Sequence, residues 1–127
     1  IIHYGHVRIF KQAREFGNRL IVGIHSDKTI ESYKRIPIMT MEERIEVIGA
    51  FRDVDVVIPN APLVITEEYI SEHNINIVCH GHNKEEHEDY RYMYDIPEKM
   101  GIFRRLNYTS GISTTMIIER LKQNYNL

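Results

Sequence analysis

Short, continuous apolar runs alternate along this chain with stretches whose apolar residues recur at helical spacing. Runs at residues 20–24, 54–58 and 76–79 are typical of strands covered on both faces, and residues 103–108 predict a last strand. This βαβα order predicts an α/β fold, a Rossmann-like open parallel sheet with helices on both faces. A length of 127 residues predicts a single domain, residues 1–127.

The starts of the predicted helices carry capping residues. Thr40 precedes Glu43 by three positions, which is the spacing of a capping box. Three further helices are preceded by a hydroxyl residue: Ser26, Thr66 and Ser113. After the third strand, a stretch rich in Glu and His predicts a polar loop over the ligand site. A short helix, broken or started at Pro97, is expected to follow it.

Composition excludes several broad classes. The formal net charge of −2 does not fit a general nucleic-acid binder, which usually carries a basic excess. No apolar run approaches the roughly 20 residues of a transmembrane helix, and no signal-peptide pattern is present. The single cysteine, Cys79, fits a reducing compartment, so a cytoplasmic location is expected. Because a buried strand is expected just before His3, the first strand of the sheet is expected upstream of Ile1.

Polar residues follow the predicted strands at one edge of the sheet. They lie at residues 25–27, 59–60, 80–81 and 110–111, and His3 joins them if a strand precedes it. In open parallel sheets, ligands bind outside the carboxyl ends of the strands. The sequence therefore predicts one ligand site at this edge.

The tetrapeptide His3-Tyr4-Gly5-His6 is the first candidate for this site. It stands at the start of a predicted helix, whose free N–H groups and dipole favour an anion. The two imidazoles add hydrogen-bond donors, and Gly5 is expected to leave room for a phosphate. Two surface histidines in a loop are the alternative interpretation. A zinc pair is disfavoured, because such pairs usually need a third ligand nearby.

The segment Gly111-Ile112-Ser113-Thr114-Thr115 is the second candidate. Gly111 permits an unusual backbone angle, and hydroxyl groups follow at the start of the closing helix. Glycine followed by hydroxyls at a helix start suits a phosphate, and an ordinary helix cap is the alternative. On one edge of the sheet, the two segments would form a single phosphate site.

Other charged side chains are weaker candidates. Lys34 is a candidate contact for a second phosphate, although a lone surface lysine usually has no specific role. One cluster superficially resembles a metal site: His80, His82, His87, Glu85, Glu86 and Glu88. Its irregular spacing argues against a metal, and no metal ligand is assigned.

Taken together, these motifs resemble the cytidylyltransferases of the nucleotidyltransferase superfamily. The pair HxGH near the start and GISTT near the end is highly specific. The likeness extends over essentially the whole chain, through residues 20–27, 40–44, 60–62, 78–81 and 101–104. These enzymes use CTP to activate phosphocholine, phosphoethanolamine or glycerol 3-phosphate. The likeness is greatest to the members that act on phosphoethanolamine, and to the C-terminal one of their two similar halves.

The resemblance implies a role for each matched residue. His3 and His6 fall on histidines that hold the CTP phosphates and stabilise charge in the transition state. Lys34 falls on the lysine that contacts the phosphate of the second substrate. His80 and Gly81 lie where the nucleotide-binding loop leaves its strand. The segment expected to cradle the triphosphate is Gly111, Ile112, Ser113 and Thr114.

Two positions depart from the family pattern. Tyr108 stands where an arginine usually helps to bind CTP, and Arg104 or Arg105 is a candidate substitute. Leu63 replaces the aromatic residue of choline-specific members, which favours ethanolamine over a quaternary ammonium. Arg44 falls on a family arginine that is expected to be structural.

The resemblance implies cytidylyl transfer from CTP to phosphoethanolamine, giving CDP-ethanolamine and pyrophosphate in phospholipid biosynthesis. Mg²⁺ is expected to accompany CTP without a cage built by the protein. Expected partners are CTP, a small phosphorylated amino alcohol, and a second copy or sister domain in a dimer or pseudo-dimer. Neither nucleic acid nor a membrane span is expected. Three alternatives stay open: a non-catalytic or nucleotide-sensing half of a tandem enzyme, a choline-phosphate cytidylyltransferase, and an adenylyltransferase.

Overall fold

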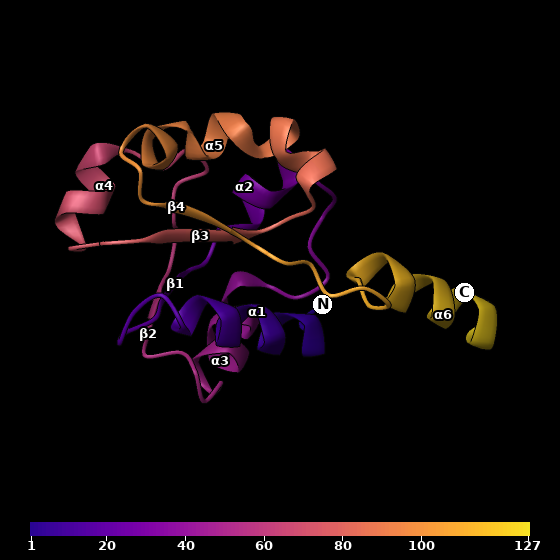
Figure 1. Ribbon diagram of the computed structural model, residues 1–127. Coiled ribbons are helices and arrows are strands. Elements are labelled where there is room, and N and C mark those ends of the chain that lie inside the picture. Colours follow the sequence, from indigo (N-terminus) through magenta and orange to yellow (C-terminus); the bar gives the residue numbers. More distant parts are fainter.

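Helices and short strands alternate along the chain, as the computed structural model of residues 1–127 shows (Figure 1). The alternation confirms the predicted α/β class. The elements are α1 Tyr4–Arg14, β1 Ile21–Gly23, α2 Asp27–Glu31, α3 Met41–Gly49, β2 Val56–Ile58, α4 Glu67–Glu72, β3 Val78–Gly81, η1 Lys84–Glu86, α5 His87–Lys99, β4 Phe103–Leu106 and α6 Thr114–Tyr125.

All strand pairing is parallel, as predicted. β1 pairs with β2 in a register that places Ile21 opposite Val56, and β3 pairs with β4 with Val78 opposite Phe103. The expected continuous sheet is present as two hydrogen-bonded pairs, because each strand bonds only to its own partner. β1, β2 and β4 are also shorter than the runs that predicted them, whereas β3 has the predicted length but begins and ends two residues later.

The β3–β4 pair lies between two helices, with α5 over one face and α1 on the other (Figure 1). Gly81 allows α1 to approach closely. A Cβ atom at this position would lie 2.6 Å from the Cδ1 atom of Ile9. The glycine at the end of β3 is therefore needed for helix packing, whatever its role toward a ligand.

The predicted loop after β3 is helical, which corrects the sequence interpretation. η1 and α5 span this stretch, and Pro97 lies inside α5. A proline leaves the carbonyl four residues earlier without its helical donor. Here that carbonyl, of Met93, accepts a hydrogen bond of 2.9 Å from the amide of Ile65. The helix also kinks at Tyr94, whose φ of −117° and ψ of 15° are not helical.

The hydrophobic core lies between α1, β1 and α3. Phe10, Ile24 and Ile48 are buried there, and the ring of Phe51 meets that of Phe10 edge-on at 5.5 Å. Burying such side chains supplies most of the favourable free energy of folding. The core thus fixes the first turn of α1, where His3 and His6 are located, against the sheet.

The predicted caps are confirmed. The side chains of Ser26, Thr40, Thr66 and Ser113 each accept a hydrogen bond from a backbone amide in the first turn of the helix that follows. Glu43 completes the capping box by accepting a hydrogen bond from the amide of Thr40 at 2.9 Å. Capping is local in sequence, so it can be recognised without knowing the tertiary fold.

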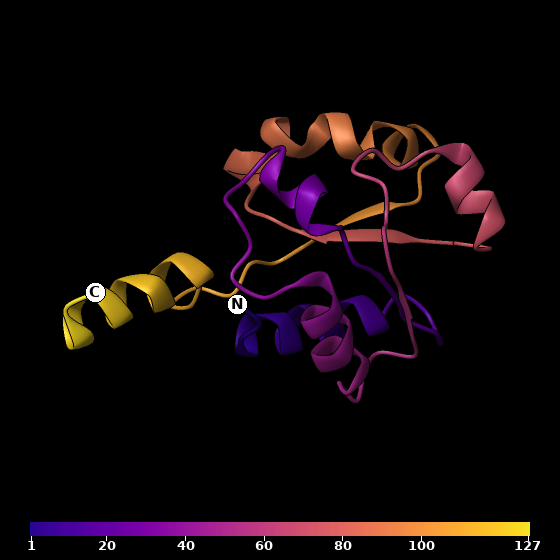
Figure 2. The ribbon, with the colours of Figure 1, turned by 180° about the vertical axis from the view of Figure 1, so that it is seen from behind.

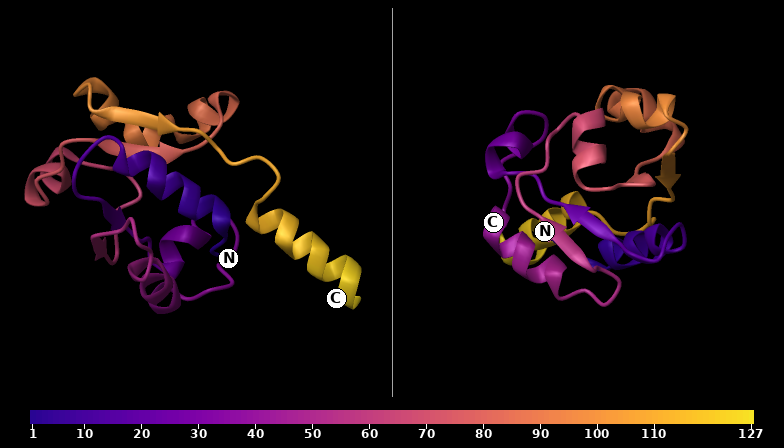
Figure 3. Two further views of the ribbon diagram at one scale, coloured as in Figure 1. Left: turned by 60° about the horizontal axis from the view of Figure 1, so that its bottom comes forward. Right: turned by 90° about the vertical axis from the view of Figure 1, so that its left-hand side faces the viewer.

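Helix α6 leaves the body of the protein, as two opposite views show (Figures 1 and 2). A third direction of view also shows α6 extending away from the other helices (Figure 3). None of its residues is buried, and Met116 and Leu121 on its apolar face are exposed. No helix of the protein combines the length and apolar character that crossing a membrane requires.

Candidate functional site

Both predicted motifs line one cavity of about 650 Å³. It lies between the start of α1, the end of β3 and the start of α6. The residues that line it are His3, Gly5, His6, Ile9, Phe10, Lys34, Arg35, Cys79, His80, Gly81, Tyr90, Tyr108, Thr109, Ile112, Ser113, Thr114 and Thr115. Every residue assigned to the site from the sequence is in this set except Gly111, whose neighbour Ile112 lines the wall.

The two histidines of the first motif cap α1 with their side chains. The Gly5 amide donates to Nδ1 of His3, and the His3 amide donates to Nδ1 of His6, each at 3.1 Å. Because Nδ1 accepts in both rings, the proton of each neutral ring is on Nε2. The motif therefore presents two N–H donors that no protein group uses, at the positive end of a helix.

Both imidazoles are neutral in the ligand-free protein. Burial and then the neighbouring His3 lower the pKa of His6 to about 4, and burial lowers the pKa of His3. The two ring centroids lie 4.3 Å apart, so two imidazolium charges would repel each other. An anion between the rings would attract both imidazolium charges, so it would raise the pKa of each ring and favour its protonated form. The site thus begins as a pair of neutral donors that can gain charge with a phosphate.

Gly5 has a different role from the one expected. A Cβ atom at this position would lie 2.7 Å from Cε1 of His3 and 3.3 Å from Cγ2 of Ile112. The Cβ side of Gly5 is occupied by the histidine ring and by Ile112 of the second motif, while the glycine also lines the cavity. Glycine is therefore required so that His3 can fold back over the helix start and α6 can approach it.

The second motif begins α6 in the predicted manner. Gly111 has a φ of +83°, a conformation that glycine adopts without strain. The Ser113 hydroxyl accepts from the Met116 amide at 3.1 Å, so it serves as the cap. The Thr114 hydroxyl donates to the carbonyl of Ile1 at 3.2 Å, which joins the segment before α1 to the second motif. The remaining amides at the helix start are available to an anion.

Two adjacent cations line the cavity from the loop after α2. Arg35 donates a hydrogen bond to the Thr115 hydroxyl at 2.8 Å, so it joins this loop to the second motif. Lys34 has no carboxylate partner, and partial burial of its amino group followed by the charge of Arg35 lowers its pKa. Sequence reasoning found Lys34 but missed Arg35, because a surface arginine in a loop carries no local signal.

Neither arginine suggested as a substitute for the missing one lines the cavity. Arg105 donates to the carbonyl of His82 at 2.8 Å, and Arg104 donates to the carbonyl of Phe103 at 2.9 Å. This suggestion is therefore wrong, since both guanidinium groups are used in local structure. Tyr108 does lie on the cavity wall, and Arg35 is the one arginine that shares this wall.

Arg44 is structural, as expected. It donates to the carbonyl of His25 at 3.0 Å and pairs with Asp27 at 2.5 Å. These contacts hold the loop between β1 and α2 against α3. Leu63 does not line the cavity, so the position that the resemblance connects with choline is not in its wall.

The cavity wall contains no carboxylate. Magnesium prefers carboxylate and phosphate oxygens, so the residues present do not fit a metal site built by the protein. The group of three histidines and three glutamates considered from the sequence is also not arranged to hold a metal ion. His80, His82 and His87 instead bond to one another through their ring nitrogens.

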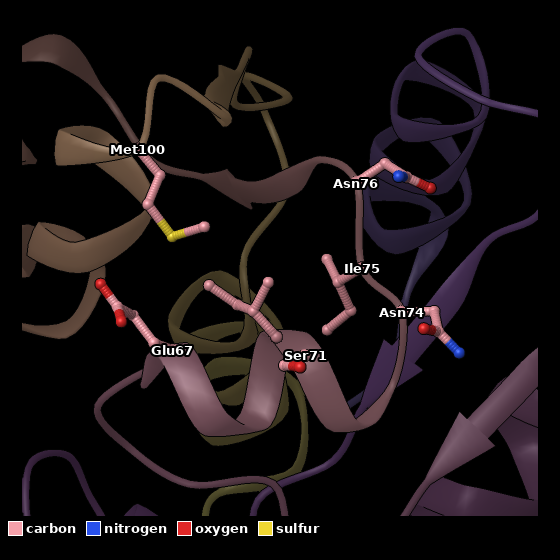
Figure 4. A pocket seen from close by; sticks show the side chains of 7 residues that line it. Glu67, Ser71, Asn74, Ile75, Asn76 and Met100 are labelled. Atoms are coloured by element: carbon pink, nitrogen blue, oxygen red, sulfur yellow. The ribbon is translucent and has the colours of Figure 1, made fainter.

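A second hollow lies between α4 and Met100, which follows α5 (Figure 4). Its wall is formed by α4, the segment after it, and Met100 at the end of α5. The only charged side chain there is Glu67, and Ser71, Asn74 and Asn76 add neutral polar groups. With no cluster of donors or bases, this hollow offers no constellation for chemistry.

Comparison with known proteins agrees with the motifs. The family model described as Cytidylyltransferase-like matches residues 1–120. Ethanolamine-phosphate cytidylyltransferase of Mus musculus is 38% identical over 95% of this chain and 30% of its own length. A probable ethanolamine-phosphate cytidylyltransferase of Encephalitozoon cuniculi is 39% identical over 95% of this chain and 38% of its own length. Choline-phosphate cytidylyltransferase of Saccharomyces cerevisiae is 34% identical over 99% of this chain and 30% of its own length.

The chain thus spans about a third of the length of these relatives. Among solved structures, a lipopolysaccharide core biosynthesis protein from Thermoplasma volcanium has a TM-score of 0.65. The alignment covers 86% of this chain and 88% of that one, at 23% identity. At that identity the likeness concerns the fold alone.

Proposed function

The chain belongs to the cytidylyltransferase-like family, and from this premise we propose that it transfers a cytidylyl group from CTP to phosphoethanolamine. The products are CDP-ethanolamine and pyrophosphate. The observation that carries the proposal is that His3, His6 and the start of α6 line one cavity. Imidazole N–H groups, two side-chain cations and a helix start together suit a triphosphate.

In this proposal, a phosphate oxygen of phosphoethanolamine attacks the α-phosphorus of CTP. A new P–O bond forms as the bond to the bridging oxygen of pyrophosphate breaks, and pyrophosphate leaves with that electron pair. The protein acts by positioning and by stabilising the negative charge that develops. His3 and His6 donate from Nε2 to the phosphates, and Lys34 holds the phosphate of the second substrate. His80 and Gly81 contribute to the nucleotide end of the cavity.

The proposal of ethanolamine over choline rests on two supports. The matching relatives named for ethanolamine phosphate are 34–39% identical to this chain, and those named for choline phosphate are 34–35% identical. In addition, Leu63 stands where choline-specific members carry an aromatic residue. Because Leu63 is outside the cavity wall, choline phosphate is the second candidate substrate, with Tyr90 and Tyr108 as the available aromatic rings.

Mg²⁺ in this proposal is brought by the triphosphate, since the cavity wall provides no carboxylate. We further propose that a strand upstream of Ile1 completes the sheet beside the two pairs described. A second copy or a sister domain is proposed to pair with this domain, supported by the exposed apolar face of α6. A cytoplasmic setting is proposed from the lone Cys79.

The decisive experiment measures product formation by the chain purified with its native upstream residues. CDP-ethanolamine and CDP-choline are quantified with CTP and each phosphorylated amino alcohol, and ATP replaces CTP in a parallel series. We expect CTP-dependent CDP-ethanolamine formation. No turnover by the folded protein at saturating CTP would favour a non-catalytic half, an interpretation that Tyr108 supports. In that case, activity gained by Tyr108→Arg would identify the missing charge as the cause.

A further inference from the structure

Three imidazoles and one carboxylate form a continuous row that starts at the cavity. Nδ1 of His80 lies 2.8 Å from Nδ1 of His82, and Nε2 of His82 lies 2.9 Å from Nδ1 of His87. Nε2 of His87 in turn lies 2.5 Å from a carboxylate oxygen of Glu98. The middle ring, His82, is 1% exposed, so the row runs through the interior of the domain.

The kink in α5 makes this row possible. His87 and Glu98 belong to the same helix and are separated by 11 positions. In a straight helix this separation would place them about 16 Å apart. The break at Tyr94 folds the helix back, so that the two side chains touch. An irregular backbone thus brings a carboxylate to the end of a histidine row.

Glu98 determines the direction of every hydrogen bond in the row. An ionised carboxylate only accepts, so Nε2 of His87 donates to it. When His87 is neutral, its Nδ1 must accept, which makes Nε2 of His82 the donor. Nδ1 of His82 then accepts, and Nδ1 of His80 donates. The one proton of neutral His80 is therefore on Nδ1, and Nε2 carries a free lone pair.

Nε2 of His80 remains available to a ligand. It makes no hydrogen bond within the protein, and the only buried side-chain polar atom without a partner is the hydroxyl of Tyr69. His80 lines the cavity, and its ring stacks on Tyr94 at a centroid distance of 4.9 Å. The ring is thus held by a hydrogen bond on one side and by an aromatic face, and its unpartnered Nε2 is not fully buried.

We infer that Glu98, His87 and His82 are positioning residues, which fix His80 as a hydrogen-bond acceptor for an N–H group of a substrate. This inference rests on the proposed function, and it specifies that one part of the proposed site accepts a hydrogen bond. A lone pair repels phosphate oxygens, so His80 does not belong to the phosphate cradle. Two N–H groups are available in the proposed reaction: the exocyclic amine of cytosine, and the ammonium of phosphoethanolamine. UTP and phosphocholine lack these respective donors.

The surroundings favour neutral rings at His80 and His82. Burial lowers the pKa of His80 to about 3, and burial followed by the neighbouring His87 lowers the pKa of His82. A proton added to His87 would reverse the direction of the hydrogen bonds along the row, because both nitrogens of His87 would then donate. The charged and titratable groups around the row are Lys34, His25, Tyr90, Tyr94, Glu86, Arg91 and Arg105.

The direct test is ¹⁵N NMR of the histidine rings in the ligand-free protein at about pH 8. The chemical shifts of the ring nitrogens distinguish protonated from bare atoms. We expect a proton on Nδ1 of His80 and none on Nε2. A proton on Nε2 in the wild-type protein would overturn the inference. This measurement needs no turnover, so it stands apart from any failure of the proposed function.

The matched variants are Glu98→Gln and Glu88→Gln. An amide can both donate and accept, so Glu98→Gln allows the row to run in either direction. We expect partial protonation of His80 Nε2, together with a loss of about tenfold in one discrimination, either CTP over UTP or phosphoethanolamine over phosphocholine. The discrimination that falls identifies which of the two substrate N–H groups donates to His80. Glu88 lies on the same helix outside the row, and Glu88→Gln should change neither.

Unchanged discrimination in both arms, despite an altered His80 tautomer, would show that the row is only structural and would contradict the inference. Thermal unfolding of each variant controls for loss of fold. Should Glu98→Gln fail to fold, the wild-type NMR result alone decides the question, since it reads the proton position directly.

Discussion

Two groups of histidines meet at one cavity with opposite hydrogen-bonding polarity. His3 and His6 accept backbone amides at Nδ1, so they present N–H groups from Nε2. His80, at the end of a row that leads to Glu98, presents a lone pair instead. The difference arises from what each ring touches behind it: a helix start in the first case, and a carboxylate in the second. In the proposed function, histidine therefore serves phosphates at one end of the cavity and an N–H group at the other.

The largest effect is expected from removing a hydrogen-bond donor at the end of the cavity proposed to bind phosphates. His6→Ala should lower turnover by about 100- to 1,000-fold, because a donor aimed at developing charge is lost. Initial rates of CDP-ethanolamine formation measure it. His73→Ala is the matched control, since His73 follows α4 and lies outside the cavity wall. Equal turnover in His6→Ala and wild type would remove His6 from the site.

Acid should destabilise the protein through both histidine groups. The pKa of His6 is about 4 and that of His80 about 3 when folded, whereas an unfolded histidine titrates near about 6.5. Below about pH 6.5 the unfolded chain therefore binds protons that the folded chain does not. The free energy of unfolding should fall by about 2–4 kcal/mol between about pH 7.5 and 5.

Urea denaturation at the two pH values measures this fall. His6→Gln should reduce it substantially, because one of the two histidines with the most strongly lowered pKa is removed. His73→Gln, a histidine substitution outside the cavity wall, is the matched control. A stability that is constant or rises on acidification would contradict neutral, buried imidazoles in the folded protein.

Gly5→Ala tests how the first motif is built. A Cβ atom 2.7 Å from the His3 ring must displace that ring. We expect a stability loss of about 1–3 kcal/mol and a clear loss of CTP affinity. Gly17→Ala is the control, because a Cβ atom there meets nothing within 4 Å. Retained CTP affinity in Gly5→Ala would show that the position of His3 is not critical.

Arg35→Gln should have the smallest effect of the series. Its guanidinium joins the loop after α2 to Thr115, so its loss should weaken CTP binding by about tenfold, as expected for one charge-assisted contact. Calorimetric titration measures the affinity, with Arg52→Gln as the control, because Arg52 follows α3 in the chain and lies outside the cavity wall. Restoration of affinity by combining Arg35→Gln with Tyr108→Arg would show that the two positions can supply the same charge.

Local features of the fold were predictable, and tertiary ones were not. The caps at Ser26, Thr40 and Thr66 depend on contacts within four residues, so their spacing was sufficient. The extent of helix α5 was missed, since only a short helix broken or started at Pro97 was expected, and the carbonyl that Pro97 leaves free is satisfied by the distant amide of Ile65. The separation of the sheet into two pairs also depends on partners far apart in the chain.

The residues of the candidate site likewise divide into those that the sequence predicted and those that only the structure identifies. The two phosphate motifs were recognisable because each is contiguous in sequence. Arg35 reaches the cavity only because its loop meets α6, and the polarity of His80 depends on Glu98, which folds back through the kink at Tyr94. Neither contact has a signature in the sequence. Short contiguous motifs thus identify candidate site residues from the sequence alone. Whether each side chain donates or accepts a hydrogen bond can be decided only from the structure.

The most direct test of the central claim follows the histidine ring nitrogens by ¹⁵N NMR while CTP is added at about pH 7. The account predicts that His3 and His6 shift as their Nε2–H groups meet the phosphates. Both rings should also gain protons, because the anion raises their lowered pKa values. His73, outside the cavity, should stay unchanged. Binding of CTP with no change at His3 and His6 would contradict the claim that these donors form the phosphate end of the cavity.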